Sequence, residues 1–138
     1  MSESSSARRT YQIVNLTRQT ILATRARLAA SWWERAVGLL TRRRLEDGEA
    51  LILPGAGSIH TIGMRFPIDV LVVNRHGEVQ AALQSLPPGR LSPWWRGVGA
   101  VIECPVGTIH RSSTTTGDRL AWSAVPPNRP EWPTTALT

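Results

Sequence analysis

Three polar side chains of different chemistry lie close together in the stretch from residue 58 to residue 78 (SIHTIGMRFPIDVLVVNRHGE). His60 could move a proton near neutral pH, Arg65 could bind an anion through two parallel hydrogen bonds, and Asp69 could orient either side chain. An apolar run follows Asp69, so we expect this carboxylate to be partly buried. It would then need donors such as Arg65 or the backbone N–H groups of residues 60–64. We therefore predict that Asp69 is a structural polar anchor for the glycine-bearing loop. The alternatives are a ligand site made by His60 and Arg65, and acid–base catalysis by His60.

A pair of adjacent tryptophans, Trp94 and Trp95, lies in a loop over residues 86–99 that is rich in Pro and Gly. Loops of this length in a small domain are often functional. Aromatic faces near arginine and histidine suit sugars and acidic groups. We predict a pocket between this loop and the loop over residues 54–65, with His60, Arg65, Trp94 and Trp95 as ligand contacts.

Other chemistry has less support in the sequence. Cys104 is the single cysteine, so the chain can form neither an internal disulfide nor a thiolate metal cage, and we expect a small buried side chain there. The three histidines do not stand at metal-binding spacings, so we predict no metal and no cofactor. A serine nucleophile is also unsupported, because the run Gly57-Ser58-Ile59-His60 lacks the second glycine of a nucleophile elbow.

Short strands are the elements that would position these residues. Alternation over residues 11–16 and 20–28 predicts a first hairpin. Ser31 and Glu34 form a capping box, which predicts a helix to about Leu40 carrying Trp32 and Trp33, whose roles stay open. Further strands are expected over residues 49–53, 66–74, 78–86, 100–104 and 119–124, with a tight hairpin at residues 74–77 and a short helix within residues 105–113.

This order of elements predicts an α+β fold with a small, largely antiparallel, barrel-like sheet and one or two short helices. Residues 1–9 are predicted to be a disordered segment, residues 10–125 a single globular α+β domain, and residues 126–138 a mobile tail rich in Pro and Thr.

Composition limits the partners of the chain. Its 138 residues carry a net charge of +6, and all 16 basic residues are arginine. No nucleic-acid reader motif accompanies that charge, so nucleic acid is an unlikely partner. The apolar runs are too short for a membrane span, and no secretory signal opens the chain, so we predict a cytoplasmic protein.

Five blocks in order resemble the domain of unknown function 192 family, an uncharacterised ancient conserved region. They are residues 34–40 (ERAVGLL), 59–70 (IHTIGMRFPIDV), 74–79 (NRHGEV), 101–107 (VIECPVG) and 116–120 (TGDRL). The resemblance implies a small mixed barrel with the central block near an open end. It implies no established reaction. A lysine present in many relatives has no counterpart here, so no role of that lysine transfers. Some relatives lie near genes for pilus or secretion machinery, which implies an accessory role at the cell envelope.

Two functions follow from these residues. The first is a non-catalytic binding or accessory module for a sugar or acidic ligand, or for a protein of the envelope machinery. The second is a small hydrolase-like enzyme that uses His60 and Asp69 to handle protons and Arg65 to hold an anion.

Overall fold

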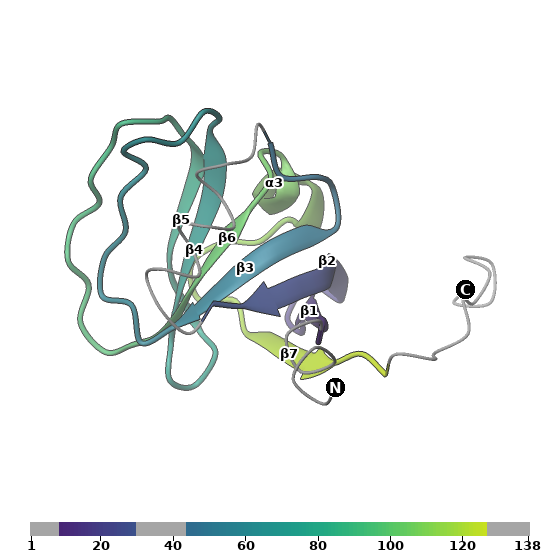
Figure 1. Cartoon of the computed structure of the whole chain (residues 1–138). Coiled ribbons are helices and arrows are strands. Elements are labelled where there is room, and N and C mark those ends of the chain that lie inside the picture. Colours follow the sequence, from purple (N-terminus) through teal and green to yellow (C-terminus); the bar gives the residue numbers. More distant parts are fainter. Residues whose placement is uncertain (1–8, 30–43, 127–138) are drawn as a thin grey trace, which may run out of the picture.

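The computed structural model describes residues 9–29 and 44–126, which form seven strands and one short helix (Figure 1). The elements are β1 (Tyr11–Asn15), β2 (Thr20–Leu28), β3 (Glu49–Pro54), β4 (Ile68–Asn74), β5 (Val79–Leu86), β6 (Val98–Cys104), α3 (Thr108–Ser112) and β7 (Leu120–Ala124). Every strand expected from the sequence is confirmed to within two residues at each end.

All seven strands belong to one sheet in the order β5-β4-β6-β3-β2-β1-β7. The β2–β3 pair is parallel and the other neighbouring pairs are antiparallel. The sheet curls until its two ends meet, through a bridge between Glu78 and Arg119. The expectation of a largely antiparallel, barrel-like sheet is confirmed, and its form is a half-barrel.

The α+β assignment needs correction, because the described part of the chain is more nearly all-β. Its helix has five residues, whereas strands make up most of the ordered structure. The predicted helix from Ser31 to Leu40, with Trp32 and Trp33, lies outside the described residues, as do the predicted disordered residues 1–8 and the tail from residue 127. Among the described residues, no helix is long and apolar enough to cross a membrane.

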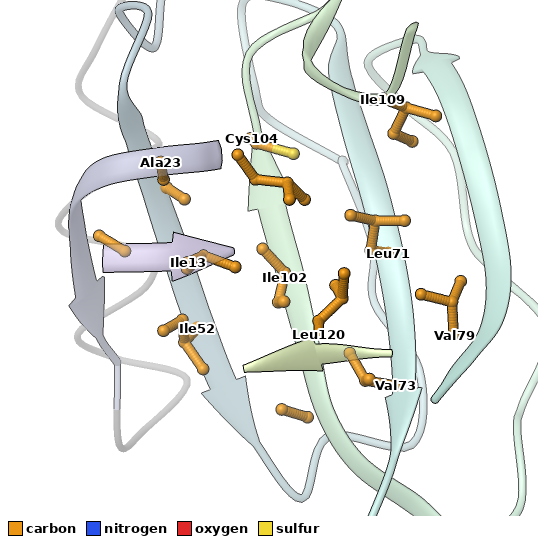
Figure 2. Close-up of a cluster of buried hydrophobic side chains, with 14 residues drawn as sticks. Ile13, Ala23, Ile52, Leu71, Val73, Val79, Ile102, Cys104, Ile109 and Leu120 are labelled. Atoms are coloured by element: carbon orange, nitrogen blue, oxygen red, sulfur yellow. The ribbon is translucent and has the colours of Figure 1, made fainter. Parts of the chain in front are cut away.

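Both faces of the sheet are covered, and the alternation of β4 shows how. Leu71 and Val73 point into the concave cluster drawn in Figure 2, together with Ile102 and Ile109. The intervening residues of β4 point to a second cluster on the convex face, which contains Ile59, Met64, Phe66, Ile68, Val70 and Val72. A strand buried on both faces is apolar at nearly every position, which explains the unbroken run in the sequence.

Candidate functional site

Asp69 is a buried carboxylate that accepts hydrogen bonds from three backbone N–H groups. Its Oδ1 atom accepts from Ser85 at 2.9 Å, and its Oδ2 atom accepts from Gly107 at 3.1 Å and Ile109 at 3.0 Å. The side chain is 1% exposed. Buried carboxylates need such donors, since an unpaired one would carry a large desolvation cost. Asp69 therefore joins the end of β5 and the start of α3 to β4.

The donors to Asp69 differ from those expected, which were Arg65 and the N–H groups of residues 60–64. The reason is the alternation of β4. Asp69 lies on the same side of the strand as Leu71, facing α3, whereas Ile59 and Met64 pack on the opposite face. The sheet therefore separates the Asp69 carboxylate from the loop that carries His60. The structure does not bring His60, Arg65 and Asp69 together.

A backbone irregularity turns Ser85 towards Asp69. The pairing of β4 with β5 shifts register between Ile68 and Val70, and Ser85 has a φ of 53°. That left-handed conformation is uncommon outside glycine, and bulges of this kind re-aim backbone groups. The bulge thus presents the Ser85 N–H to the carboxylate.

Cys104 is packed beside Asp69 in the concave cluster. It is 1% exposed, and its thiol donates to the Asp69 carbonyl oxygen over 3.6 Å. Burial raises the pKa of this thiol far above its usual range, and the nearby Asp69 charge raises it further. Cys104 is therefore a buried, protonated side chain, which agrees with the small buried side chain expected there.

Sequence reasoning missed a second buried polar cluster around Asp118. The Asp118 Oδ2 atom accepts from Asn15 Nδ2 at 3.0 Å, from the Thr115 N–H at 3.0 Å and from Arg18 Nε at 3.1 Å. Burial alone would raise the pKa of Asp118, but these hydrogen bonds outweigh it and hold the pKa below the ordinary value. The two bonds from Asn15 and Arg18 join the end of β1 and the β1–β2 turn to the turn before β7, about 100 residues apart. Only tertiary pairing could reveal them.

Two long loops lie side by side on the convex side of the half-barrel (Figure 1). One links β3 to β4 over residues 55–67 and the other links β5 to β6 over residues 87–97; together we name them the double loop. Backbone bonds join them along their length: Thr61 N–H to the Arg90 carbonyl at 2.8 Å, Ser92 N–H to the Ile59 carbonyl at 2.9 Å, and Trp95 N–H to the Gly57 carbonyl at 2.9 Å. An isolated bridge pairs His60 with Leu91. The expected association of these two loops is therefore observed.

Gly57 holds the indole of Trp94. A Cβ atom built on Gly57 would lie 2.6, 2.7 and 2.9 Å from three consecutive atoms of the six-membered ring of Trp94. Such nearly equal distances place the glycine over the face of the ring. Trp94 is nevertheless 75% exposed. One indole face therefore lies on the Gly57 backbone, and the other is open to solvent.

The remaining residues of the predicted pocket have different surroundings. Trp95 is half-buried and packs against the convex cluster, so it anchors the double loop. His60 is half-buried, whereas Arg65 is exposed. The double loop also exposes two large apolar side chains that were not among the predicted site residues. The exposed fraction is 59% for Ile62 and 76% for Leu91.

The double loop carries positive charge alone. It contains Arg65, Arg90 and Arg96, all exposed, and neither of its segments contains Asp or Glu. Exposed apolar side chains surrounded by cations suit an anionic ligand with an apolar part.

A metal cluster is absent from the part of the chain that the structure describes. Within residues 9–29 and 44–126, no group of three or more His, Cys, Asp and Glu side chains could hold a metal ion. His76 is exposed in the β4–β5 turn, where the Asn74 side chain accepts the N–H groups of residues 76 and 78.

Comparison with known proteins gives a family and a fold. The family model of domain of unknown function 192, described as an uncharacterized ACR, matches residues 13–122. A protein of unknown function from Novosphingobium aromaticivorans is similar in structure, with a TM-score of 0.68, 23% identity, and coverage of 81% of this chain and 83% of that one. A Sinorhizobium meliloti protein described as a proposed transcription regulator also has a TM-score of 0.68. Its sequence identity is 18%, and the match covers 83% of this chain and 92% of that one. No curated protein matches the chain.

Proposed function

The chain belongs to the domain of unknown function 192 family, and from that premise we propose that it is a non-catalytic binding module whose ligand has a flat ring face and an acidic group. The double loop is the binding surface. Uronic-acid oligosaccharides combine these two properties, since each pyranose ring has an apolar face and carries a carboxylate. An accessory role beside envelope machinery, which the family resemblance implies, would be one setting for such a module.

The open face of Trp94 is the observation that carries this proposal. Stacking on an aromatic ring needs a ring that is both accessible and held in place. The ring of Trp94 is 75% exposed while its other face lies against Gly57. The platform is thus preorganised, which lowers the entropic cost of binding.

The acidic part of the ligand follows from the cations beside the platform. Arg90 and Arg96 flank Trp94 in its own segment, and Arg65 comes from the other. Guanidinium groups bind carboxylates through two parallel hydrogen bonds, and no carboxylate in the double loop competes for them.

The hydrolase alternative has less support. It requires His60 and Asp69 to act as a pair, yet the Asp69 carboxylate is bonded to three backbone N–H groups on the other side of the sheet.

Isothermal titration with oligogalacturonate, and with a neutral cello-oligosaccharide for comparison, tests the proposal. We expect oligogalacturonate to bind and the neutral sugar to bind more weakly. Trp94→Ala should weaken binding about tenfold, because an aromatic contact contributes about 1 kcal/mol beyond its buried area, whereas Trp94→Phe should retain most of it. Arg96→Gln should also weaken binding, whereas its matched charge control Arg27→Gln, on the exposed side of β2, should bind like wild type. Equal affinity of wild type and Trp94→Ala for oligogalacturonate would refute the proposed surface.

A further inference from the structure

Strand β7 is an edge of the sheet, and the direction of its backbone groups can be assigned. The carbonyl of Arg119 accepts from Leu16, and the N–H of Val125 donates to Thr10, so odd-numbered residues face β1. The N–H of Leu120 instead donates to the Gly77 carbonyl at 2.7 Å, on the other side of the strand. Trp122 and Ala124 follow Leu120 with the same parity. Their N–H and carbonyl groups therefore point away from β1.

No strand among the described residues covers this part of β7. The β4–β5 hairpin pairs with residues 117–120, and this pairing ends at the contact between Gly77 and Leu120. A Cβ atom on Gly77 would lie 2.6 Å from the Leu120 carbonyl oxygen. From residue 121 onward, no residue within 9–29 and 44–126 pairs with this edge. An open edge is a template for an added strand.

A hollow of about 340 Å³ lies beside this open edge. Its lining is contributed by the β4–β5 turn, the start of β6 and the strand β7: Asn74, Arg75, His76, Gly77, Gly99, Leu120, Ala121 and Trp122. The volume is at the lower end of the range of ligand pockets, about 300–1,000 Å³. A side chain projecting from an added strand could enter it.

The charges around the hollow select its occupant. Arg75 and His76 line it and are exposed, and its lining includes no acidic residue. The Asn74 Oδ1 atom accepts the N–H groups of His76 at 2.9 Å and Glu78 at 3.0 Å, so the turn that carries Arg75 and His76 is held in one conformation. Glu78, just outside the lining, is paired with Arg119 at 3.6 Å. The charge complement is therefore a carboxylate.

We infer that an extended acidic peptide segment of another protein adds to the open edge of β7 and places a carboxylate in this hollow, against Arg75. The main chain of the peptide bonds to the outward groups of Trp122 and Ala124, and the side chain supplies selectivity. This site is separate from the double loop.

Fluorescence anisotropy with labelled heptapeptides tests the inference. The probe alternates valine and glutamate. One comparison peptide replaces glutamate by lysine, and another keeps the glutamates but is N-methylated at alternate residues, so it cannot donate along one edge. We expect the acidic peptide to bind about tenfold more tightly than either comparison peptide. Equal binding of the N-methylated peptide would overturn strand addition.

Two matched pairs of variants locate the site. Ala124→Pro removes an outward N–H without breaking a bond to β1, whereas Ala124→Ser keeps that N–H. Arg75→Gln removes the cation from the hollow, whereas Arg111→Gln removes a cation from α3. We expect Ala124→Pro and Arg75→Gln each to weaken binding about tenfold and both controls to bind like wild type.

Two further measurements distinguish peptide binding at the β7 edge from binding at the double loop and from self-association. Trp94→Ala should bind the acidic peptide like wild type, and a loss there would assign the peptide to the double loop and overturn the inference. Sedimentation should show that the protein binds the peptide as a monomer. A dimer that persists when peptide is saturating would assign the β7 edge to a second copy of this chain and would also overturn it.

Discussion

The Asp69 carboxylate and the Trp94 indole lie on opposite sides of the same sheet and differ in how their bonding capacity is used. Asp69 is buried, and three backbone donors occupy its oxygens. Trp94 is held by one face and presents the other to water. Bonds made inside the protein stabilise the fold, whereas an ordered but open surface is available to a ligand. Asp69, the residue of the block over residues 59–70 that seemed best suited to catalysis, is therefore a structural residue.

The strongest test of this contrast is Asp69→Ala, which we expect to lower the free energy of unfolding by about 2–4 kcal/mol, because three buried N–H groups lose their acceptor. Urea unfolding followed by far-UV circular dichroism measures the change. Asp69→Asn keeps one carbonyl oxygen and should cost less. An unchanged unfolding midpoint in Asp69→Ala would contradict the structural role of Asp69.

A second test uses Asp118, whose carboxylate is also buried and bonded. Asp118→Asn should cost about 1–3 kcal/mol at pH 7. The pKa of Asp118 is lowered in the folded state, so the unfolded chain takes up the proton first as the pH falls. The stabilisation is thus present above the ordinary aspartate pKa of about 3.9 and is lost as the pH falls through the folded pKa. The difference in melting temperature between wild type and variant should shrink as the pH falls below about 3.9, and a difference independent of pH would contradict this assignment.

Gly57→Ala tests the contact between the Gly57 backbone and the ring of Trp94. The added methyl group would meet the Trp94 ring at 2.6 Å, so the ring must move, at a cost of about 1 kcal/mol. Combining it with Trp94→Ala should remove the clash, and the double variant should then be about as stable as Trp94→Ala alone. Additive losses in urea unfolding would mean that the two residues are not in contact.

The smallest effect is expected for Trp94→Ala by itself. An exposed side chain outside the core changes stability by about 0.5 kcal/mol or less, even where it matters for binding. If Trp94→Ala is as stable as wild type but binds oligogalacturonate more weakly, Trp94 acts in binding, whereas Asp69 acts in stability. A loss above about 2 kcal/mol would place Trp94 among the structural residues.

Much of the fold could be predicted because local patterns govern it. Alternation located the first hairpin, and the turn at residues 74–77 located the second, with Gly77 at a φ of 85°. The burial of Asp69 followed from the apolar residues around it. The hydrogen-bond donors to Asp69 could not be predicted, because the register of β4 in the sheet decides whether its side chain faces α3 or the double loop.

The candidate site was predicted in outline. The two loops do associate, and Trp94 is exposed, but Trp95 is turned inward and His60 is separated from Asp69 by the sheet. In a loop, the orientation of each side chain depends on the residues it packs against. The sequence has no periodic pattern there from which that orientation could be predicted. The support of Trp94 by Gly57, 37 positions away, belongs to the same class of information.

By itself, the sequence determined the strands, the turns, the excess of arginine over acid and the family, because each follows from the types and spacing of near neighbours. The tertiary structure decided which buried carboxylate meets which donors, which tryptophan stays in solvent and which strand edge is left unpaired by the described residues. Those outcomes depend on strand order and on which face of the curled sheet each side chain occupies. Both are fixed only when segments distant in the chain come together.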